Sequence, residues 1–414
     1  MKNFLRSLTP ALLLSVYHRA WALGGAAWYG HPSRRLVVVG VTGTKGKSTT
    51  AELIAVILRA QGHKVAVAST IHFALNGEEE RNLFKMTMPG RAYLQKFLRK
   101  ALEGGSTHAV VEMTSEGVKQ MRHLGIELDA LVFTNLQPEH LESHGGMEAY
   151  GMAKLELARQ LERSQKRPRT IAANMDDPWG ERFLAAKVER KAPYSLKDAK
   201  AYSTDDKSVR FVWREALFAV PLPGLFNLYN CLAALAAVEA LGVPLEIARK
   251  ALDHIGPIPG RAQRIECGQK FDAVVDYAHT PDSLKALMET FKNKRLVCVV
   301  GSTGGGRDTW NRPQKGKIAD HYCDVSIITN EDPYDEDPQK IVEAIAKGFS
   351  AHTPQIILDR RAAIAAALRE ARGGDAVLIT GKGTDPYIMA ARGGKIPWSD
   401  AQVIKEELKK LGYH

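Results

Sequence analysis

The stretch VVVGVTGTKGKSTTAELIAVIL, residues 37–58, combines an apolar run, a glycine-rich loop and a helical pattern. Residues 36–41 predict a buried strand, because they form a short β-branched run. Residues 49–59 place apolar side chains at helical spacing and predict a helix. The loop between them therefore lies at a helix N-terminus, where unpaired N–H groups and the helix dipole favour an anion.

The loop is close to a phosphate-binding loop but not identical to it. Lys47 is placed to reach the outer phosphates, and Ser48 to coordinate Mg²⁺. Val41 stands where the strict pattern has its first glycine, and a glycine-rich turn with an incidental lysine is the alternative. The residues expected to bind the triphosphate of a nucleotide are Gly43, Thr44, Lys45, Gly46, Lys47, Ser48 and Thr49.

Composition limits the remaining possibilities. A chain of 414 residues predicts two or three domains. Its formal charge of +11 comes without an arginine-rich run or a basic-aromatic patch. We therefore expect anionic small substrates or an anionic membrane surface rather than nucleic acid. The four cysteines form no CxxC pair, which predicts reduced thiols and no zinc site.

Residues 1–35 predict a short hydrophobic helical segment. The run LTPALLLSVYHRAWALGGAAWYG is interrupted by His18 and Arg19 and is too short to span a bilayer. Trp21 and Trp28 suit a helix packed on the protein and a helix at a membrane surface equally well. A cleaved signal is a third and less favoured alternative.

Strands alternate with helices through the rest of the chain. The stretches HAVVEM, DALVFTN and RTIAAN read as buried strands that end in polar residues, as in a parallel sheet. Residues 192–222 change to short β segments and predict an appended antiparallel sheet. GPIPGR, residues 256–261, marks a hinge before a second α/β alternation. We predict an α/β protein with a central P-loop domain (36–258), a Rossmann-like C-terminal domain (259–414) and a cleft between them.

Eight motifs carry a family resemblance from about residue 36 to the end. In chain order they are GVTGTKGKSTT, TNLQPEHLESHGGMEAYGMAK, GLFNLYNCLAA, PGRAQRIE, DYAHTPDSL, GSTGGGRDTWNRP, TNEDPYDEDP and GKGTD. Together they resemble the Mur ligase superfamily, and most closely its UDP-N-acetylmuramoyl-tripeptide synthetases (MurE-type). The resemblance implies an ATP- and Mg²⁺-dependent ligase of peptidoglycan synthesis, which phosphorylates a muramoyl-peptide carboxylate for attack by an amino acid.

Other readings use the same ATP machinery. A folylpolyglutamate-synthase-like or cyanophycin-synthetase-like ligase would act on a different carboxylate, but DYAHTPDSL and GKGTD favour the muramoyl branch. A non-catalytic regulator would be expected to lose Lys47, Glu112 or Lys154, and all three are present. Without the resemblance, a transporter or motor ATPase would be the reading.

The resemblance also implies a set of metal-site residues. Glu112 and His140 match family positions at the magnesium site, although a histidine that caps a helix is the alternative for His140. Lys154 matches the lysine that these ligases carbamylate, which would turn an ammonium into an anionic oxygen ligand. Without the motif, Lys154 would be an ordinary solvated helix lysine.

Further positions match ATP contacts of the family. Asn227 and Asn230 share one face at a helix start and match its adenine-side asparagines, although asparagine there is often a cap. Arg261 and Asp276 match residues that reach phosphate and ribose, and an ion pair is the alternative. Because both follow the hinge, we expect domain closure to complete the site and exclude water.

Substrate contacts are implied by the same motifs. The matching residues are Thr87, Gly90, Ser115, His279, Asp332, Tyr334, Gly381 and Asp385. Two positions depart from the family. In EMTSEGV, Glu116 stands where a histidine is usual, and MTMPG (86–90) replaces an Asn-Thr-Thr-Gly-like loop. These departures bear on contacts to the muramoyl peptide and leave the phosphoryl-transfer residues in place.

The amino acid to be added follows from another departure. Family members that add meso-diaminopimelate use the arginine of an Asp-Asn-Pro-Arg motif for the distal carboxylate, and Tyr334 stands at that position. Asp385 replaces a glutamate, and the loop from 331 to 337 is acidic, although its last three acids suit a solvated surface equally well. We therefore predict a diamino acid without the distal carboxylate, such as L-lysine or L-ornithine.

The expected surroundings follow from the same resemblance. MurE-type enzymes carry a uridine-nucleotide-binding domain before the P-loop, and the roughly 35 residues here are below the size that folds alone. We expect weak recognition of the UDP group, a cytoplasmic monomer, and contact of residues 1–30 with the protein or with a membrane.

Overall fold

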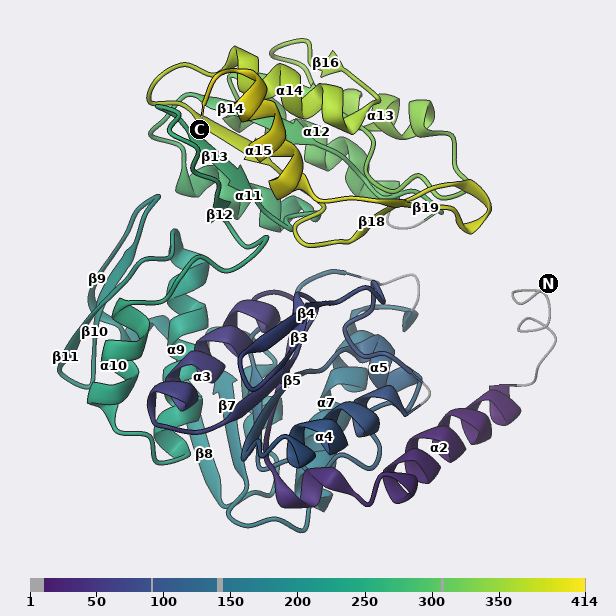
Figure 1. Ribbon diagram of the computed structural model, residues 1–414, viewed down its shortest axis with the longest axis vertical. Coiled ribbons are helices and arrows are strands. Elements are labelled where there is room, and N and C mark those ends of the chain that lie inside the picture. Colours follow the sequence, from purple (N-terminus) through teal and green to yellow (C-terminus); the bar gives the residue numbers. More distant parts are fainter. Residues whose placement is uncertain (1–10, 91, 140–143, 307–308, 414) are drawn as a thin grey trace. The chain divides into compact units, whose positions relative to one another are not determined.

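The computed structural model describes residues 11–90, 92–139, 144–306 and 309–413, with side chains from residue 14 onward (Figure 1). The chain divides into two compact units, and each has its own sheet. The first unit comprises residues 1–202, 211–219 and 228–255, and the second comprises residues 203–210, 220–227 and 256–414.

An eight-stranded sheet forms the centre of the first unit, in the order β4-β3-β2-β5-β1-β6-β7-β8. From β2 to β8 the strands pair in parallel, while β3 and β4 extend the edge as antiparallel strands. The strands are β1 (Val37–Thr42), β2 (Val65–Ala68), β3 (His72–Leu75), β4 (Glu78–Arg81), β5 (His108–Glu112), β6 (Ala130–Phe133), β7 (Thr170–Asn174) and β8 (Arg190–Tyr194).

The predicted strand and helix around the glycine-rich loop are confirmed as β1 and α3. β1 lies between β5 and β6, and a parallel strand covered on both faces requires a continuous apolar run. Val38, Val39 and Val41 are accordingly fully buried. The central position of β1 places the loop after it at the carboxyl edge of the sheet, beside the ends of its neighbours.

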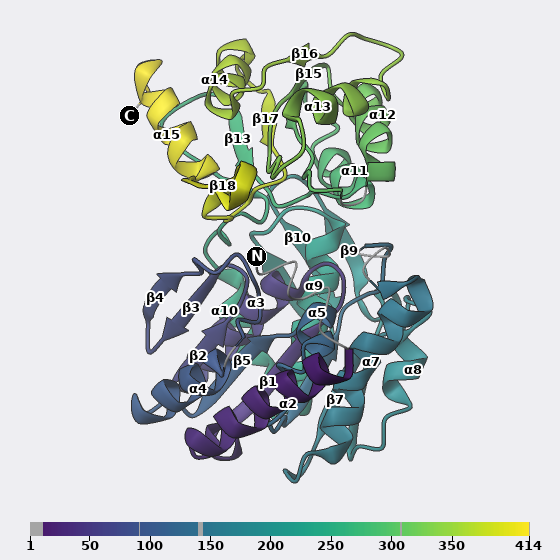
Figure 2. The ribbon, with the colours of Figure 1, turned by 90° about the vertical axis from the view of Figure 1, so that its right-hand side faces the viewer.

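The helices of this part of the chain pack on the sheet or on one another (Figure 2). They are α2 (Ala11–Trp28), α3 (Lys47–Ala60), α4 (Tyr93–Glu103), α5 (Ser115–Lys119), α7 (Met147–Arg163), α8 (Gly180–Leu184), α9 (Leu225–Ala240) and α10 (Leu245–Asp253), with 3₁₀ turns η1 (Pro32–Arg35) and η2 (Leu196–Asp198). No helix in the described part of the chain is both long and apolar enough to cross a membrane.

The region from 192 to 222 differs in part from its prediction. The first segment, β8, pairs in parallel with β7 and so belongs to the large sheet. The remaining segments form a separate sheet in the order β11-β10-β9. These strands are β9 (Lys200–Thr204), β10 (Val209–Trp213) and β11 (Ala216–Val220). The sequence pattern of residues 192–222 predicted the β segments. It did not predict that one of them would join the larger sheet.

The second unit contains a six-stranded sheet in the order β12-β13-β17-β14-β15-β16, parallel except for β12. Its strands are β12 (Gln263–Arg264), β13 (Asp272–Val275), β14 (Leu296–Val300), β15 (Val325–Ile328), β16 (Gln355–Ile356) and β17 (Ala376–Ile379), and β18 (Tyr387–Met389) pairs with β19 (Lys395–Pro397). Its helices are α11 (Pro281–Thr290), α12 (Arg312–Tyr322), α13 (Pro338–Ala346), α14 (Arg360–Glu370) and α15 (Asp400–Lys410), with turns η3 (Thr309–Asn311) and η4 (Ala391–Gly393). The α/β class predicted from the sequence is confirmed.

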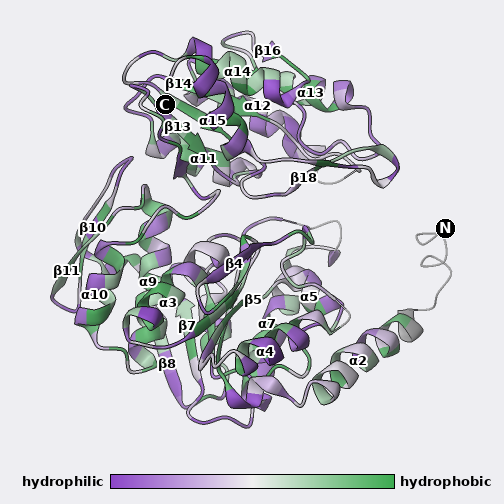
Figure 3. Ribbon diagram, viewed as in Figure 1, coloured by the Kyte–Doolittle hydropathy of each residue, from purple (hydrophilic) through white to green (hydrophobic). Residues whose placement is uncertain are grey.

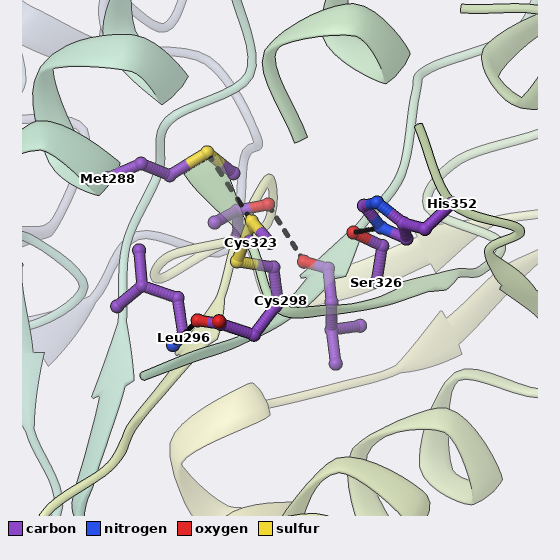
Figure 4. Close-up of a disulfide and its surroundings, with 9 residues drawn as sticks. Met288, Leu296, Cys298, Cys323, Ser326 and His352 are labelled. Atoms are coloured by element: carbon purple, nitrogen blue, oxygen red, sulfur yellow. Dashed lines mark hydrogen bonds between the residues drawn. A yellow bond between two sulfur atoms is a disulfide. The ribbon is translucent and has the colours of Figure 1, made fainter. Parts of the chain in front are cut away.

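The prediction of four reduced thiols is wrong for two cysteines. Cys298 in β14 and Cys323 at the end of α12 form a disulfide with a Cα–Cα distance of 6.0 Å (Figure 4). Spacing could not reveal this pair, because the strand and the helix end meet only in the folded unit. Cys231 and Cys267 are free thiols.

Candidate functional site

The glycine-rich loop fits its surroundings only with glycine at two positions. Gly43 has φ +146°, and a Cβ there would lie 1.9 Å from Thr134 Oγ1. Gly46 has φ +81°, and its Cβ would lie 2.2 Å from Asn230 Oδ1. Both backbone conformations disfavour other residues, and both close approaches exclude a side chain. The loop is therefore held tightly against β6 and α9.

Ser48 and Glu112, two of the expected magnesium ligands, are in direct contact. Ser48 Oγ donates to Glu112 Oε2 at 2.9 Å, and the Thr70 N–H donates to the same oxygen at 2.8 Å. Glu112 ends β5 and is 2% exposed, while Ser48 lies in the first turn of α3. β1 and β5 are adjacent parallel strands, so Ser48, which follows β1, and Glu112, at the end of β5, meet although they are 64 residues apart in the sequence.

Lys154 projects from α7 to the back of the same loop. Its Nζ donates to the Gly43 carbonyl at 2.6 Å and lies 4.6 Å from the centre of the Tyr150 ring. Burial, and then the neighbouring charge of Lys47, lower the pKa of Lys154 well below its usual value. A lysine in this position is not the solvated helix lysine that its spacing alone would suggest.

The two lysines of the glycine-rich stretch itself, Lys45 and Lys47, bind different partners. Lys47 Nζ donates to the Thr44 carbonyl at 2.8 Å and lies 3.9 Å from Glu112 Oε1. Lys45 Nζ donates to Glu139 Oε1 at 3.2 Å. Three lysines and two carboxylates thus surround one loop, which is the mixed charge that a metal–nucleotide complex requires.

Asn227 and Asn230 both lie in α9 and are both buried. The Thr50 hydroxyl donates to Asn230 Oδ1 at 3.5 Å, so Asn230 lies against the first turn of α3. Asn227 Nδ2 donates to the Pro223 carbonyl at 2.8 Å. That bond joins Asn227 to the residues just before the helix.

The expected acceptor side adjoins Glu112. Thr87 Oγ1 lies 2.7 Å from Thr70 Oγ1, and Thr70 is the residue whose N–H binds Glu112. Gly90 lies against Arg122, since a Cβ on Gly90 would be 3.3 Å from the Arg122 guanidinium. These residues share one neighbourhood, although they come from separate stretches of the chain.

Ser115 begins α5 and is 3% exposed. The next residue, Glu116, departs from the family pattern, and its carboxylate lies 3.6 Å from His144 Nδ1. The His144 ring packs edge-on against Tyr150, whose hydroxyl lies 3.2 Å from Thr44 Oγ1. The substituted position is therefore linked to the nucleotide loop through a histidine and a tyrosine.

In the second unit, Asp276 and Arg261 lie side by side at the end of β13. Asp276 accepts from the N–H groups of Ala262 and Ala278, each at 2.6 Å. The Arg261 guanidinium lies 4.6 Å from the centre of the Tyr277 ring. His279 Nδ1 is 2.8 Å from the Tyr277 carbonyl. These residues form one cluster within the second unit.

A second cluster in that unit is built around a fully buried lysine. Lys382 Nζ donates to Asp332 Oδ1 at 2.9 Å and to Asp385 Oδ2 at 3.4 Å. Asp332 also accepts from the Met389 N–H. A buried ion pair must be matched closely to be tolerated, and Asp332 and Asp385 are thereby fixed in place.

Glu331 and Gly381 complete this cluster. A Cβ on Gly381, which has φ +100°, would lie 2.3 Å from Glu331 Oε2. Thr303 donates to Glu331 Oε1 at 2.7 Å, but no hydrogen-bond partner of Oε2 occurs among the residues that the structure describes. Glu331 is 2% exposed, so this carboxylate oxygen is buried without a hydrogen-bond donor among the described residues.

Tyr334 has φ +53° and lies beside Gly305. The last three acids of its loop have structural partners: Asp335 accepts from the Arg392 N–H, Glu336 pairs with Arg312, and Asp337 caps α13. Asp335 and Asp337 are exposed, as the solvated-surface alternative expects, whereas the ion pair with Arg312 makes Glu336 part of the local structure.

Sequence reasoning missed Glu139, Tyr150 and Lys382 as members of these clusters. Each of them lies inside a quoted motif and has a partner that is distant in the sequence: Lys45 for Glu139, Thr44 for Tyr150 and Asp332 for Lys382. His140, a predicted metal ligand, lies outside the described residues. Within the described ranges, no group of three or more His, Cys, Asp or Glu is arranged to hold a metal.

Comparison with known families gives two matches. A family model described as the Mur ligase middle domain matches residues 41–238, and one described as the Mur ligase glutamate ligase domain matches residues 260–383. A ligase of Syntrophomonas wolfei named UDP-N-acetylmuramoyl-L-alanyl-D-glutamate--2,6-diaminopimelate ligase is 35% identical over 94% of this chain and 82% of its own. The chain belongs to the Mur ligase family.

Two further comparisons agree. A UDP-N-acetylmuramyl-tripeptide synthetase of Roseiflexus is 37% identical over 98% of this chain and 84% of its own. A solved diaminopimelate ligase structure superposes with a TM-score of 0.62 at 29% identity, covering 95% of this chain and 84% of that one. This Mur ligase is thus an ATP-dependent acid–amino-acid ligase of peptidoglycan precursor synthesis.

Proposed function

We propose that this ligase joins a diamino acid to the carboxylate of a muramoyl peptide, with ATP and Mg²⁺. The observation that carries the proposal is the Ser48–Glu112–Lys154 cluster around one phosphate-binding loop. The names of its relatives support a UDP-linked muramoyl dipeptide as the acceptor. ATP would phosphorylate the acceptor carboxylate, and the amine would then displace phosphate from the acyl phosphate.

The residues at the loop fit a magnesium ion. Ser48 and Glu112 offer the oxygen ligands that Mg²⁺ prefers, and their oxygens already lie 2.9 Å apart. The ion would neutralise phosphate charge while the carboxylate approaches ATP. We extend the site to His140 on the family pattern alone.

Lys154 fits the role of a carbamylated ligand. Carbamylation requires an unprotonated amine, and the buried position of Lys154 disfavours its charged form. The carbamate would supply an anionic oxygen close to the loop. Lys47 would contact the outer phosphates, where its ammonium would stabilise the negative charge that develops on ADP as the phosphoryl group is transferred.

The roles of the other predicted residues are also part of this proposal. Asn227 and Asn230 would contact adenine, and Arg261 and Asp276 would contact phosphate and ribose. Thr87, Gly90, Ser115 and His279 would line the acceptor side. Each of these assignments rests on the motif match, together with the local contacts described above.

We propose L-lysine or L-ornithine as the added amino acid. A buried carboxylate oxygen of Glu331 without a hydrogen-bond donor among the described residues suits a substrate ammonium. Asp332 and Asp385 share one cation, Lys382, and so leave further net negative charge close by. Tyr334 offers no cation to a distal carboxylate, which would be repelled by the acids around it.

meso-Diaminopimelate is the second candidate, because the named relatives include ligases for it. The folylpolyglutamate synthase reading rests on fold alone: a solved synthase superposes with a TM-score of 0.71 at 15% identity, covering 91% of this chain and 97% of that one.

Phosphate release with a panel of amino acids tests the choice. We expect lysine or ornithine to give a kcat/KM at least about tenfold higher than meso-diaminopimelate, as one unmatched carboxylate costs 1.4 kcal/mol or more. Tyr334→Arg should raise the relative use of diaminopimelate, whereas Tyr334→Phe, the matched control, should not. A wild-type preference for diaminopimelate would contradict the assignment and leave the ligase reaction itself untouched.

A further inference from the structure

The outward face of α2 is unusual for a surface helix. Its exposed large side chains are Val16 (58%), Tyr17 (47%), Trp21 (45%), Leu23 (43%) and Trp28 (85%). Arg19 is the one exposed Lys, Arg, Asp or Glu among residues 14–28. A helix on a water-facing surface normally directs its polar side outward, and here the outward side is apolar and aromatic. Hydrophobic residues recur along α2 in Figure 3.

The opposite face of α2 is fixed to the protein by small residues. Ala22, Gly25 and Ala26 are buried. A Cβ on Gly25 would lie 2.2 Å from the Cβ of Ala92, just before α4, so helix and loop are in close contact. The orientation of α2 is therefore set, and its aromatic face is directed away from the unit.

A basic groove adjoins the end of this helix. It has a volume of about 450 Å³ and is formed by residues 27–30 together with the exposed side of α4. The α4 side chains in it are Lys96, Arg99, Lys100 and Glu103. Three cations against one acid give the groove a net positive charge, although Arg99 and Glu103 pair at 2.7 Å.

We propose that this α2 surface, residues 16–28 with Lys96, Arg99 and Lys100, docks the ligase on an anionic phospholipid bilayer. Tryptophan and tyrosine favour the headgroup level of a membrane, where an apolar ring and a polar edge are both accommodated. Lysine and arginine extend their charged ends to lipid phosphates. The combination of an aromatic face and adjacent cations matches a lipid surface on both counts.

A second copy of the chain is the occupant that this proposal has to exclude. Two identical surfaces would bring the cations of one groove close to those of the other, which disfavours a symmetric contact. An anionic bilayer instead supplies the opposite charge. Docking on lipid goes beyond the proposed ligase reaction, because it concerns where the enzyme acts on its acceptor.

Vesicle flotation of the full chain tests the proposal. We expect binding to vesicles of equal parts phosphatidylglycerol and phosphatidylcholine, weak binding to phosphatidylcholine alone, and weaker binding at high salt. Trp21→Ser with Trp28→Ser should reduce partitioning at least about tenfold. Lys96→Gln with Lys100→Gln should reduce it about thirtyfold, because each cation contributes about fivefold.

Matched variants elsewhere control for general surface effects. Leu217→Ser with Ile396→Ser removes apolar residues that are 63% and 52% exposed, and Lys250→Gln with Lys292→Gln removes two surface charges. Both should bind vesicles as the wild type does. All variants should keep ligase activity on a water-soluble acceptor, which separates this test from that of the reaction.

Three results would overturn the proposal. One is equal binding to anionic and neutral vesicles, and another is wild-type binding by the tryptophan variant. The third is a dimer, seen in analytical ultracentrifugation, that dissociates in the tryptophan variant while vesicle binding stays unchanged. The α2 surface would then be an interface between copies of the chain.

Discussion

Lys154 shows how the position of a side chain changes its chemistry. A lysine in a helix is normally solvated and charged, but this one is 1% exposed and donates to the Gly43 carbonyl. The motif around it could be recognised from the sequence, whereas its burial behind the loop could not. The same holds for Lys382, because its partner Asp332 lies 50 residues earlier in the sequence.

Replacing Lys154 tests its proposed role as an anionic ligand. Lys154→Ala should lose nearly all activity, and a small carboxylic acid such as acetate should restore part of it by supplying the missing oxygen. Lys166 is a control, because it is a partly buried lysine that also has a lowered pKa, and it pairs with Asp129. Acetate should not help Lys166→Ala.

Steady-state phosphate release with increasing acetate provides the measurement. Full activity of Lys154→Ala without acetate would refute the carbamate role.

His123 predicts a pH dependence of stability. Burial lowers the pKa of this histidine to about 4, and its Nδ1 has no hydrogen-bond partner among the described residues. Because the folded-state pKa lies below the unfolded value of about 6.5, protonation disfavours the folded state as the pH falls from about 6.5 to about 4. The loss of unfolding free energy should reach about 3 kcal/mol at the lower end.

His123→Gln should remove that part of the acid sensitivity, while the His123 carbonyl continues to accept from Gln160. Urea unfolding at several pH values measures it, with the exposed His321→Gln as control. An unchanged slope of unfolding free energy against pH in His123→Gln would contradict the assignment.

At the level of helices and strands, the sequence predicted most of what is present. Runs of β-branched residues between helical patterns located β1, β5, β6, β7 and the core strands of the second sheet, because parallel strands buried on both faces must be continuously apolar. The membership of β8 in the large sheet was missed, since pairing partners are not encoded in a local pattern. The Cys298–Cys323 disulfide was missed for the same reason.

That disulfide should make stability sensitive to reductant. The bond joins β14 to the end of α12 across 25 residues, and closing a loop of this size contributes about 3 kcal/mol in the chain-entropy account. Dithiothreitol should therefore lower the Tm of the wild type by several degrees. Cys298→Ala with Cys323→Ala should show no such response.

Cys231→Ala, which removes a buried free thiol, is the matched control and should respond to reductant as the wild type does. Differential scanning fluorimetry and a thiol count under denaturing conditions give the readout. Four titratable thiols in the oxidised protein would show that the bond does not form.

For the whole molecule, the order of eight motifs was sufficient to identify the family, and the two family models and the relatives confirm it. Recognition was possible because ATP cleavage constrains many backbone and charged positions at once. The amino acid and the acceptor depend on a few side chains, such as Tyr334 and Glu331, whose surroundings are set by tertiary contacts.

The central claim is that the loop cluster of Lys47, Ser48, Glu112 and Lys154 couples ATP cleavage to amide formation. Its most direct test is phosphate release by the full chain with ATP, Mg²⁺, a UDP-linked muramoyl dipeptide and L-lysine, with each component omitted in turn and the product identified by mass spectrometry. We predict one amide formed per phosphate, no release when acceptor or amine is absent, and a loss of at least about a thousandfold in folded Lys47→Ala. Phosphate release that is independent of acceptor and amine, or near-normal turnover of Lys47→Ala, would contradict the account.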